Sequence, residues 1–448
     1  MIDIPPGSDT REFDLVIRGA RVVADDHEGP RAIAISQGMI AAVLPPNADL
    51  DAREEITIGA DAVILPGLVD SHVHICDPGT DWEGFATATA AAAASGITTL
   101  VDMPIDSFPA TVDLVSLAAK HRATEGQLHT DVAIWGGLTP GNTDKIDALL
   151  DAGVVGFKCF LVDPGSPDFE AVDDDVLTTT LAATAQAGVP VMVHAEDFAG
   201  APDPPARSRR YADWLAARPP WTEDRAVKRV IEAARRTGGR AHIAHVSSAS
   251  SLPLLEEAQA AGVAVTGETC PHYLALCAEE IADGQTAAKC GPPIRDRAHQ
   301  AALWDGLRAG TLSAVVSDHS PCLPEQKTDD FATAWAGVSS LQIALPVVWT
   351  AARARGFALT DLAQWMSTAP AALAGLRDKG RIAVGADADL CVFVPDDTFV
   401  VDPSRLLHRH PVSPYTGREL SGAVRATMLR GHWIDQSRSG RLVSREAS

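Results

Sequence analysis

Two histidines, His72 and His74, end an apolar stretch that begins at Pro66. On a β-strand, alternate side chains point to the same side, so both imidazoles can reach one metal ion. Further candidate ligands recur along the chain, each at the end of its own apolar, strand-like stretch: Lys158, His194, His245 and Asp318. Any one of these is more often a structural residue, but together they suggest a shared centre, because buried polar groups without partners are costly. The pattern predicts a metal-dependent hydrolase.

Lys158 is the unusual member of this set, because a protonated amine does not bind metal. Burial near other cations lowers the pKa of an amine. The neutral amine can then react with carbon dioxide, and the resulting carbamate can bridge two metal ions. Two ions about 3.5–4 Å apart activate a bridging water and polarise a carbonyl. Asp318 can bind one ion, accept a proton from the water and pass it to the leaving nitrogen. Such ligands suit zinc, with cobalt, manganese or iron as alternatives.

The elements that must position these groups alternate between strand-like and helix-like segments, the pattern of parallel βα units. Eight strand-like segments span residues 68–74, 98–103, 132–136, 155–160, 189–194, 241–246, 263–268 and 313–318. Eight is the number required for a closed (β/α)8 TIM barrel, in which catalytic groups lie at the carboxyl ends of the strands. Helices are expected at 82–95, 223–236 and 298–308, with Gly96 as the left-handed residue that follows the first.

Both chain ends have a different pattern, with short β-type segments and no helical period. These segments are 14–17, 32–35, 39–43 and 62–65 near the start, and 381–384, 390–394 and 426–430 near the end. The sequence therefore predicts an α/β protein whose barrel, residues 66–379, is flanked by one small β-sandwich. Residues 1–65 supply the N-terminal part of that sandwich, and residues 380–448 supply its C-terminal part and a tail.

Composition narrows the possible partners and location. The 448 residues carry a formal net charge of −22, with the acidic residues dispersed along the chain. Such a surface argues against nucleic acid and anionic membranes as partners. The seven cysteines are widely spaced and form no CxxC motif, as expected for reduced thiols in the cytoplasm. We find no signal-peptide pattern, and no apolar run approaches the ~20 residues of a membrane span.

The chain resembles the cyclic amidohydrolases of the amidohydrolase superfamily, and within them the allantoinases. The resemblance covers nearly the whole chain. Its supporting segments are residues 66–74, 99–104, 156–160, 268–272, 289–295, 316–322, 337–342 and 413–415. It implies a binuclear centre in which His72 and His74 hold the more buried ion and His194 and His245 the other. Carboxylated Lys158 (N6-carboxylysine) would bridge the ions, and Asp318 would act as ligand and acid/base.

The resemblance also implies a reaction and an assembly. The reaction opens the hydantoin ring of allantoin to give allantoate, a small-molecule conversion in cytoplasmic purine-nitrogen salvage. The family is usually homo-oligomeric, and a tetramer is favoured. The remaining histidines receive no catalytic role: His242 faces away from His245 and is interpreted as structural, whereas His272 follows a strand and could line the site.

Three alternatives are weighed against the sequence. Dihydroorotases typically carry an arginine where this chain has Cys76, and a thiol cannot replace its bidentate charge pairing. Hydantoinases and dihydropyrimidinases typically carry a tyrosine where this chain has Asp163. Members that have lost their ligands serve as non-catalytic scaffolds, but here all six positions are filled. An allantoinase-like hydrolase remains favoured over a hydantoinase-like cyclic imide hydrolase.

Substrate contacts are the least determined part of the site. Allantoinases usually have asparagine where this chain has Asp106. Ionised aspartate only accepts hydrogen bonds, so this exchange could shift specificity toward a ring or ureido group richer in N–H donors, or the residue could be a loop N-cap without a catalytic role. Cys290, Gly291 and Gly337 are the other candidate substrate-binding residues, since backbone donors there would suit an uncharged imide ring.

Overall fold

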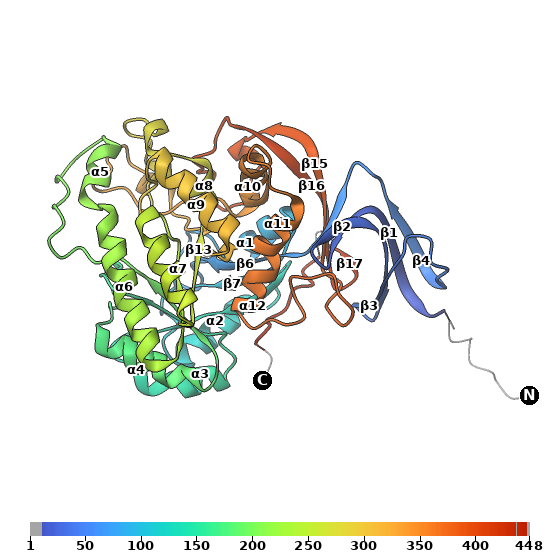
Figure 1. Ribbon diagram of the computed structural model, residues 1–448, viewed down its shortest axis with the longest axis horizontal. Coiled ribbons are helices and arrows are strands. Elements are labelled where there is room, and N and C mark those ends of the chain that lie inside the picture. Colours follow the sequence, from blue (N-terminus) through green and yellow to red (C-terminus); the bar gives the residue numbers. More distant parts are fainter. Residues whose placement is uncertain (1–10, 436, 446–448) are drawn as a thin grey trace, which may run out of the picture.

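The computed structural model describes residues 11–435 and 437–445. In Figure 1, helices surround a set of strands in the larger part of the molecule, and a sheet built from the blue N-terminal strands extends from one side. The first ten residues, on which the expectation of no signal peptide depends, lie outside the described residues. Within the described chain, no helix is both long and apolar enough to cross a membrane.

The strands of the larger part are all parallel and follow one another in chain order. One sheet contains β6 (Leu68–Val73), β7 (Ile97–Asp102) and β8 (Asp131–Ile134). The second contains β9 (Gly136–Gly137), β10 (Phe157–Phe160), β11 (Pro190–His194), β12 (Arg240–Ile243), β13 (Val265–Thr269) and β14 (Ala314–Val315). Only Trp135 separates β8 from β9, and a parallel bridge joins Val73 to His319 beyond β14. The two sheets therefore adjoin at both edges, and each of the eight predicted strand segments contains a strand.

Helices alternate with these strands and cover them. They are α1 (Phe85–Ala94), α2 (Leu114–Thr124), α3 (Ile146–Asp151), α4 (Asp174–Ala185), α5 (Tyr211–Ala217), α6 (Pro220–Thr237), α7 (Leu252–Ala260), α8 (Pro271–Ala275), α9 (Arg297–Ala309), α10 (Ala344–Arg353), α11 (Leu359–Ala363) and α12 (Ala369–Leu373). The three helices expected from sequence are α1, α6 and α9, and Gly96 has the predicted positive φ, 83°.

Helix α6 illustrates how the sequence specifies these helices. It begins with Pro220, whose missing N–H is not needed in the first turn, and it ends before Gly238 in the left-handed conformation. Val227, Val230 and Ile231 repeat at helical spacing and are buried in the main core. This apolar stripe packs toward the strands, while charged residues occupy the other face.

Strands from both chain ends join in a single eight-stranded sheet. Its order is β17-β16-β15-β5-β1-β2-β3, with β4 paired to β1. The strands are β1 (Phe13–Ala24), β2 (His27–Ser36), β3 (Met39–Leu44), β4 (Ala52–Ile58), β5 (Val63–Pro66), β15 (Leu390–Val400), β16 (Glu419–Leu429) and β17 (His432–Trp433). The predicted strand at 381–384 is wrong: bends and a turn lie there, between Gly380 and Gly385, which both have positive φ.

A buried ion cluster joins this sheet to the amino ends of the parallel strands. Nζ of Lys379 lies 2.7 Å from carboxylate oxygens of Asp131 and Asp387 and 2.8 Å from Asp389. Burial lowers the pKa of Lys379, but the three carboxylates outweigh it and raise that pKa above its ordinary value. Arg430 also pairs with Asp131. Every charge in this cluster has a partner supplied by the chain.

Candidate metal centre

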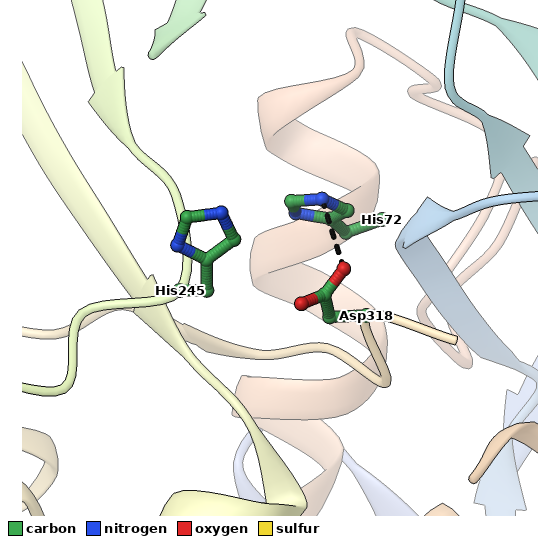
Figure 2. Close-up of side chains that lie close together, drawn as sticks. All are labelled: His72, His245 and Asp318. Carbon is green, nitrogen blue, oxygen red and sulfur yellow. Dashed lines mark ion pairs between the residues drawn. The ribbon is translucent and has the colours of Figure 1, made fainter. Parts of the chain in front are cut away.

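All six predicted ligands converge at the carboxyl ends of the parallel strands. They line one pocket with a volume of about 300 Å³. Figure 2 shows the imidazoles of His72 and His245 and the carboxylate of Asp318 around a common space. One ligand atom from each of these three residues lies within 4.8 Å of the others, and all three residues are buried. Residues that are far apart in the sequence therefore form one compact cluster.

The ligand-to-ligand distances have the scale of metal coordination. Nε2 of His72 lies 3.3 Å from Oδ1 of Asp318, and Nε2 of His74 lies 3.5 Å from the same oxygen. Ligand atoms on a tetrahedral zinc ion, with bonds of 2.0–2.1 Å, are separated by roughly 3.3–3.4 Å. Nδ1 of His194 lies 3.0 Å from Nε2 of His245, which forms a second close pair.

Carboxylates behind the histidines determine which ring nitrogen faces the pocket. Oε1 of Glu268 lies 2.5 Å from Nδ1 of His72, which leaves Nε2 free to bind a metal. Oε2 of Glu196 lies 2.9 Å from Nε2 of His194, so Nδ1 is the nitrogen that faces His245 in the cluster. Sequence reasoning missed both glutamates. Glu268 ends the predicted segment 263–268, and Glu196 lies two residues after a predicted ligand. A carboxylate at a strand end is therefore the sequence feature that could have identified both residues.

Two buried nitrogen atoms in the cluster test whether these residues fit a metal centre. Nε2 of His72 and Nζ of Lys158 are inaccessible to solvent and have no hydrogen-bond partner among the described residues. Leaving such polar atoms unpaired in the interior is unfavourable. A metal ion on His72 and a carbamate on Lys158 would satisfy both, so the donor set fits two divalent ions.

The electrostatics of the pocket lower the pKa of four of its nitrogen donors, His72, Lys158, His194 and His245. At His74, burial is outweighed by the carboxylates of Asp106 and Asp318, which raise the pKa to about 9. Burial holds the pKa of His72 and of His245 well below the ordinary value, and nearby cationic groups lower both further. Burial also lowers the pKa of Lys158 to about 8, although Glu268 and Asp318 oppose this shift. An amine with this pKa is substantially unprotonated at mildly alkaline pH, as reaction with carbon dioxide requires.

The backbone is strained at two of the predicted ligand positions. His245 and Asp318 have φ values of 36° and 44°, in the left-handed region. The predicted strands that run to residues 246 and 318 are therefore too long, since β12 ends at Ile243 and β14 at Val315. The apolar pattern continues past the point where the backbone turns to aim these side chains into the pocket.

The four candidate substrate-binding residues, Asp106, Cys290, Gly291 and Gly337, also line the pocket. Asp106 has a φ of 66°, and its Oδ2 lies 2.9 Å from Nδ1 of His74, so it also faces a predicted ligand. At Gly337, an added Cβ would lie 2.3 Å from Oγ of Ser320. This close approach requires glycine.

Arg218 is a pocket residue that sequence reasoning missed, and no local motif marks it. Its Nη1 donates a hydrogen bond to Oε2 of Glu196 at 2.8 Å. Its guanidinium carbon lies 4.3 Å from the ring centroids of both Phe198 and Trp214. These contacts hold one fixed positive charge at the wall of an otherwise anionic and imidazole-lined site.

The other singled-out histidines lie around the centre. His242, predicted to be structural, places Nε2 3.0 Å from Oε2 of Glu268 and so supports the glutamate that holds His72. His272 is fully buried but does not line the pocket; it groups instead with Cys270 and Asp318. All seven cysteines are buried and unpaired, so the prediction of free thiols is confirmed.

Comparison with known proteins assigns the family. The model of the amidohydrolase family matches residues 63–434, so the chain belongs to that family. It is 48% identical to a protein named allantoinase from Streptomyces avermitilis, over 97% of this chain and 99% of that protein. It is 38% identical to allantoinase from Escherichia coli K12, over 94% and 95% of the two chains. The solved structure of L-hydantoinase (dihydropyrimidinase) from Arthrobacter aurescens superposes with a TM-score of 0.89 at 30% identity, covering 97% of this chain and 100% of the other.

Proposed function

We propose that this protein hydrolyses allantoin to allantoate by opening the hydantoin ring in the pocket described above. The observation that carries the proposal is the set of six converging side chains, including the buried nitrogens of His72 and Lys158 that have no hydrogen-bond partner among the described residues. The allantoinase relatives, at 38–48% identity over nearly the whole chain, support allantoin as the substrate.

The six side chains would hold two metal ions between them. His72 and His74 would hold one divalent ion, His194 and His245 the other, and a carbamate on Lys158 would join them. The carbamate forms when the neutral amine attacks carbon dioxide and releases one proton. When bound, the two ions would supply an acidified water and polarise the carbonyl that is attacked.

Asp318 is the group placed to move the proton. Its Oδ1 faces Nε2 of both His72 and His74, so the carboxylate lies within the cluster rather than behind it. It would accept the proton of the attacking water and deliver it to the ring nitrogen as the C–N bond breaks. This delivery is needed because a bare amide anion is a very poor leaving group.

The hydantoinase-like alternative lacks the side chain that it needs. Position 163 is an aspartate that lines the pocket, and its Oδ1 accepts a hydrogen bond from the backbone of Gly165. None of the three tyrosines, all of which lie in the described chain, lines the pocket. Tyr211 and Tyr273 instead donate hydrogen bonds to backbone carbonyls. The absence of this tyrosine from the pocket lining therefore favours allantoin over the substrates of hydantoinases and dihydropyrimidinases.

Several finer features belong to the same proposal. We propose that the two parallel sheets form one closed (β/α)8 barrel within residues 66–379, and the bridge between Val73 and His319 supports this closure. Residues 1–65 and 380–448 would form the flanking β-sandwich. Zinc as the native metal, carbon dioxide on Lys158, a homotetramer and a cytoplasmic location remain predictions from the family resemblance.

The experiment is a substrate panel for the zinc-loaded protein prepared with bicarbonate. Racemic allantoin is compared with hydantoin, dihydrouracil and dihydroorotate, and His72→Ala serves as the metal-deficient control. Turnover of allantoin alone, stopping near half conversion, is the expected result for a stereoselective enzyme. Turnover of another ring with allantoin inert would refute the substrate assignment, and Asp106 would be the first residue to exchange for asparagine.

A further inference from the structure

A second cavity lies at the opposite end of the strands from the metal centre. Its volume is about 410 Å³, and it is bounded by residues that precede or begin β10, β11 and β12, including Val155, Gly188 and Arg240. Helix α12 and the segment after it form another wall. In Figure 1, α12 lies near the C-terminal end of the chain, whose residue Arg445 also reaches this cavity.

The lining of this cavity carries charge of one sign. Among the described residues, five cationic side chains line it and no carboxylate does: Arg240, Arg377, Lys379, Arg381 and Arg445. This concentration stands out in a chain with 37 lysines and arginines against 59 acidic residues. A concave surface lined by one sign of charge focuses the local potential and raises the concentration of counter-ions there.

Three of these cations have no anionic partner within residues 11–435 and 437–445. The side chains of Arg377 and Arg381 form no hydrogen bond or ion pair with any residue in the described part of the chain. Arg240 donates only to the backbone oxygen of Gly188, at 2.7 Å. Lys379 differs from them, because three carboxylates already neutralise its amine. Burial and the neighbouring Arg445 both lower the pKa of Arg240, which is the direction expected for a cation without compensation.

We propose that this basic cavity binds a small anion that carries at least two oxyanion groups, of which a diphosphate is the simplest example. Guanidinium groups bind phosphate and carboxylate oxygens in a planar, bidentate manner. A cavity of this size falls within the range of about 300–1,000 Å³ that is typical of small-molecule sites, so it has room for more than a single phosphate group. The ligand would bind at the end of the barrel opposite the metal centre, so occupancy need not block the substrate.

The test measures binding of inorganic pyrophosphate to the metal-loaded protein by calorimetry at fixed ionic strength. The variant is Arg377→Gln/Arg381→Gln, which removes two exposed cations from the cavity. The matched control is Arg122→Gln/Arg405→Gln, which removes two exposed cations elsewhere. The metal content of each protein is measured after titration, because pyrophosphate also binds divalent ions.

The proposal expects one saturable site per chain in the wild type and in the control, with unchanged metal content. The cavity variant should bind about tenfold more weakly or worse, as expected for the loss of two charge-assisted contacts. Equal binding by all three proteins would place the pyrophosphate elsewhere and overturn the proposal. Absence of saturable binding to the wild type would overturn it as well. Neither result depends on ring-opening activity.

Discussion

The two ends of the parallel strands treat buried charge in opposite ways. At the amino ends, the amine of Lys379 is 2.7–2.8 Å from three carboxylates. At the carboxyl ends, the equally buried amine of Lys158 has no hydrogen-bond partner among the described residues. A buried charge that the chain itself neutralises stabilises a contact within the fold, here between the parallel strands and the eight-stranded sheet. A buried group that the chain leaves unpaired indicates a component that must come from outside.

The largest effect is expected from changing Asp318, which lies within the cluster of six predicted ligands at the carboxyl ends of the strands. Asp318→Asn keeps the size of the side chain but removes its ability to accept and return a proton. We expect kcat to fall by roughly 10²–10⁴-fold, the usual contribution of a general acid–base. Steady-state kinetics on the metal-loaded variant provide the measurement. Retention of more than about a tenth of the wild-type kcat would remove Asp318 from the proton-transfer role.

The same comparison predicts that changing Lys379 affects stability rather than chemistry. Lys379→Met leaves Asp131, Asp387 and Asp389 buried with a missing counter-charge. Breaking a buried ion pair by removing one partner typically destabilises a protein by about 3–5 kcal/mol. Urea unfolding should show this loss, while kcat of the folded fraction stays unchanged. A stable variant with impaired kcat would contradict the structural role.

The pH dependence of stability should separate the two lysines. Because the raised pKa of Lys379 favours its charged form, its stabilisation is complete below the ordinary lysine pKa of about 10.4 and is lost only at higher pH.

Lys158 behaves oppositely in the metal-free protein. Its folded-state pKa is lowered to about 8, so the unfolded chain binds more protons and stability rises between pH 8 and about 10.4. Metal-free Lys158→Met should lack this rise. The measurement is the unfolding free energy of the metal-free wild type and of metal-free Lys158→Met as a function of pH. The difference between the two should grow between pH 8 and about 10.4, and a constant difference over this range would contradict the lowered pKa of Lys158.

A smaller effect is expected for Glu268, which supports the centre from behind. Glu268→Gln weakens the group that holds Nδ1 of His72, so metal affinity should fall by about 10–100-fold. Metal titration of the apoprotein gives the affinity, and Glu257→Gln on α7 is the control for charge loss away from the site. Unchanged affinity in Glu268→Gln would mean that the ring of His72 needs no such support.

The sequence predicted which six side chains line one pocket because strand ends leave a local signal: an apolar run that stops at a polar residue. The same kind of signal, short apolar strand-like segments, indicated the strands of the two parallel sheets and most strands of the sheet that both chain ends share. Strand β4 was missed because its glutamates, Glu54 and Glu55, interrupt the apolar pattern on an exposed strand.

Contacts that depend on the folded backbone were beyond sequence reasoning. Arg218 reaches the pocket from the residue before Pro219 through its pairing with Glu196, which lies 22 positions away. The left-handed turns at His245 and Asp318 also leave no trace in composition or periodicity. Likewise, the basic cavity brings together arginines from separate segments, none of which forms a charge run in the chain.

The most direct test of the central claim is the metal content of the protein after reconstitution with zinc and bicarbonate, measured together with its native mass. We predict two ions per chain and one added carbon dioxide, and we expect Lys158→Ala to lose both the added mass and at least one ion. A protein that binds no ion, or that binds two ions with Lys158 unmodified, would contradict the proposed centre.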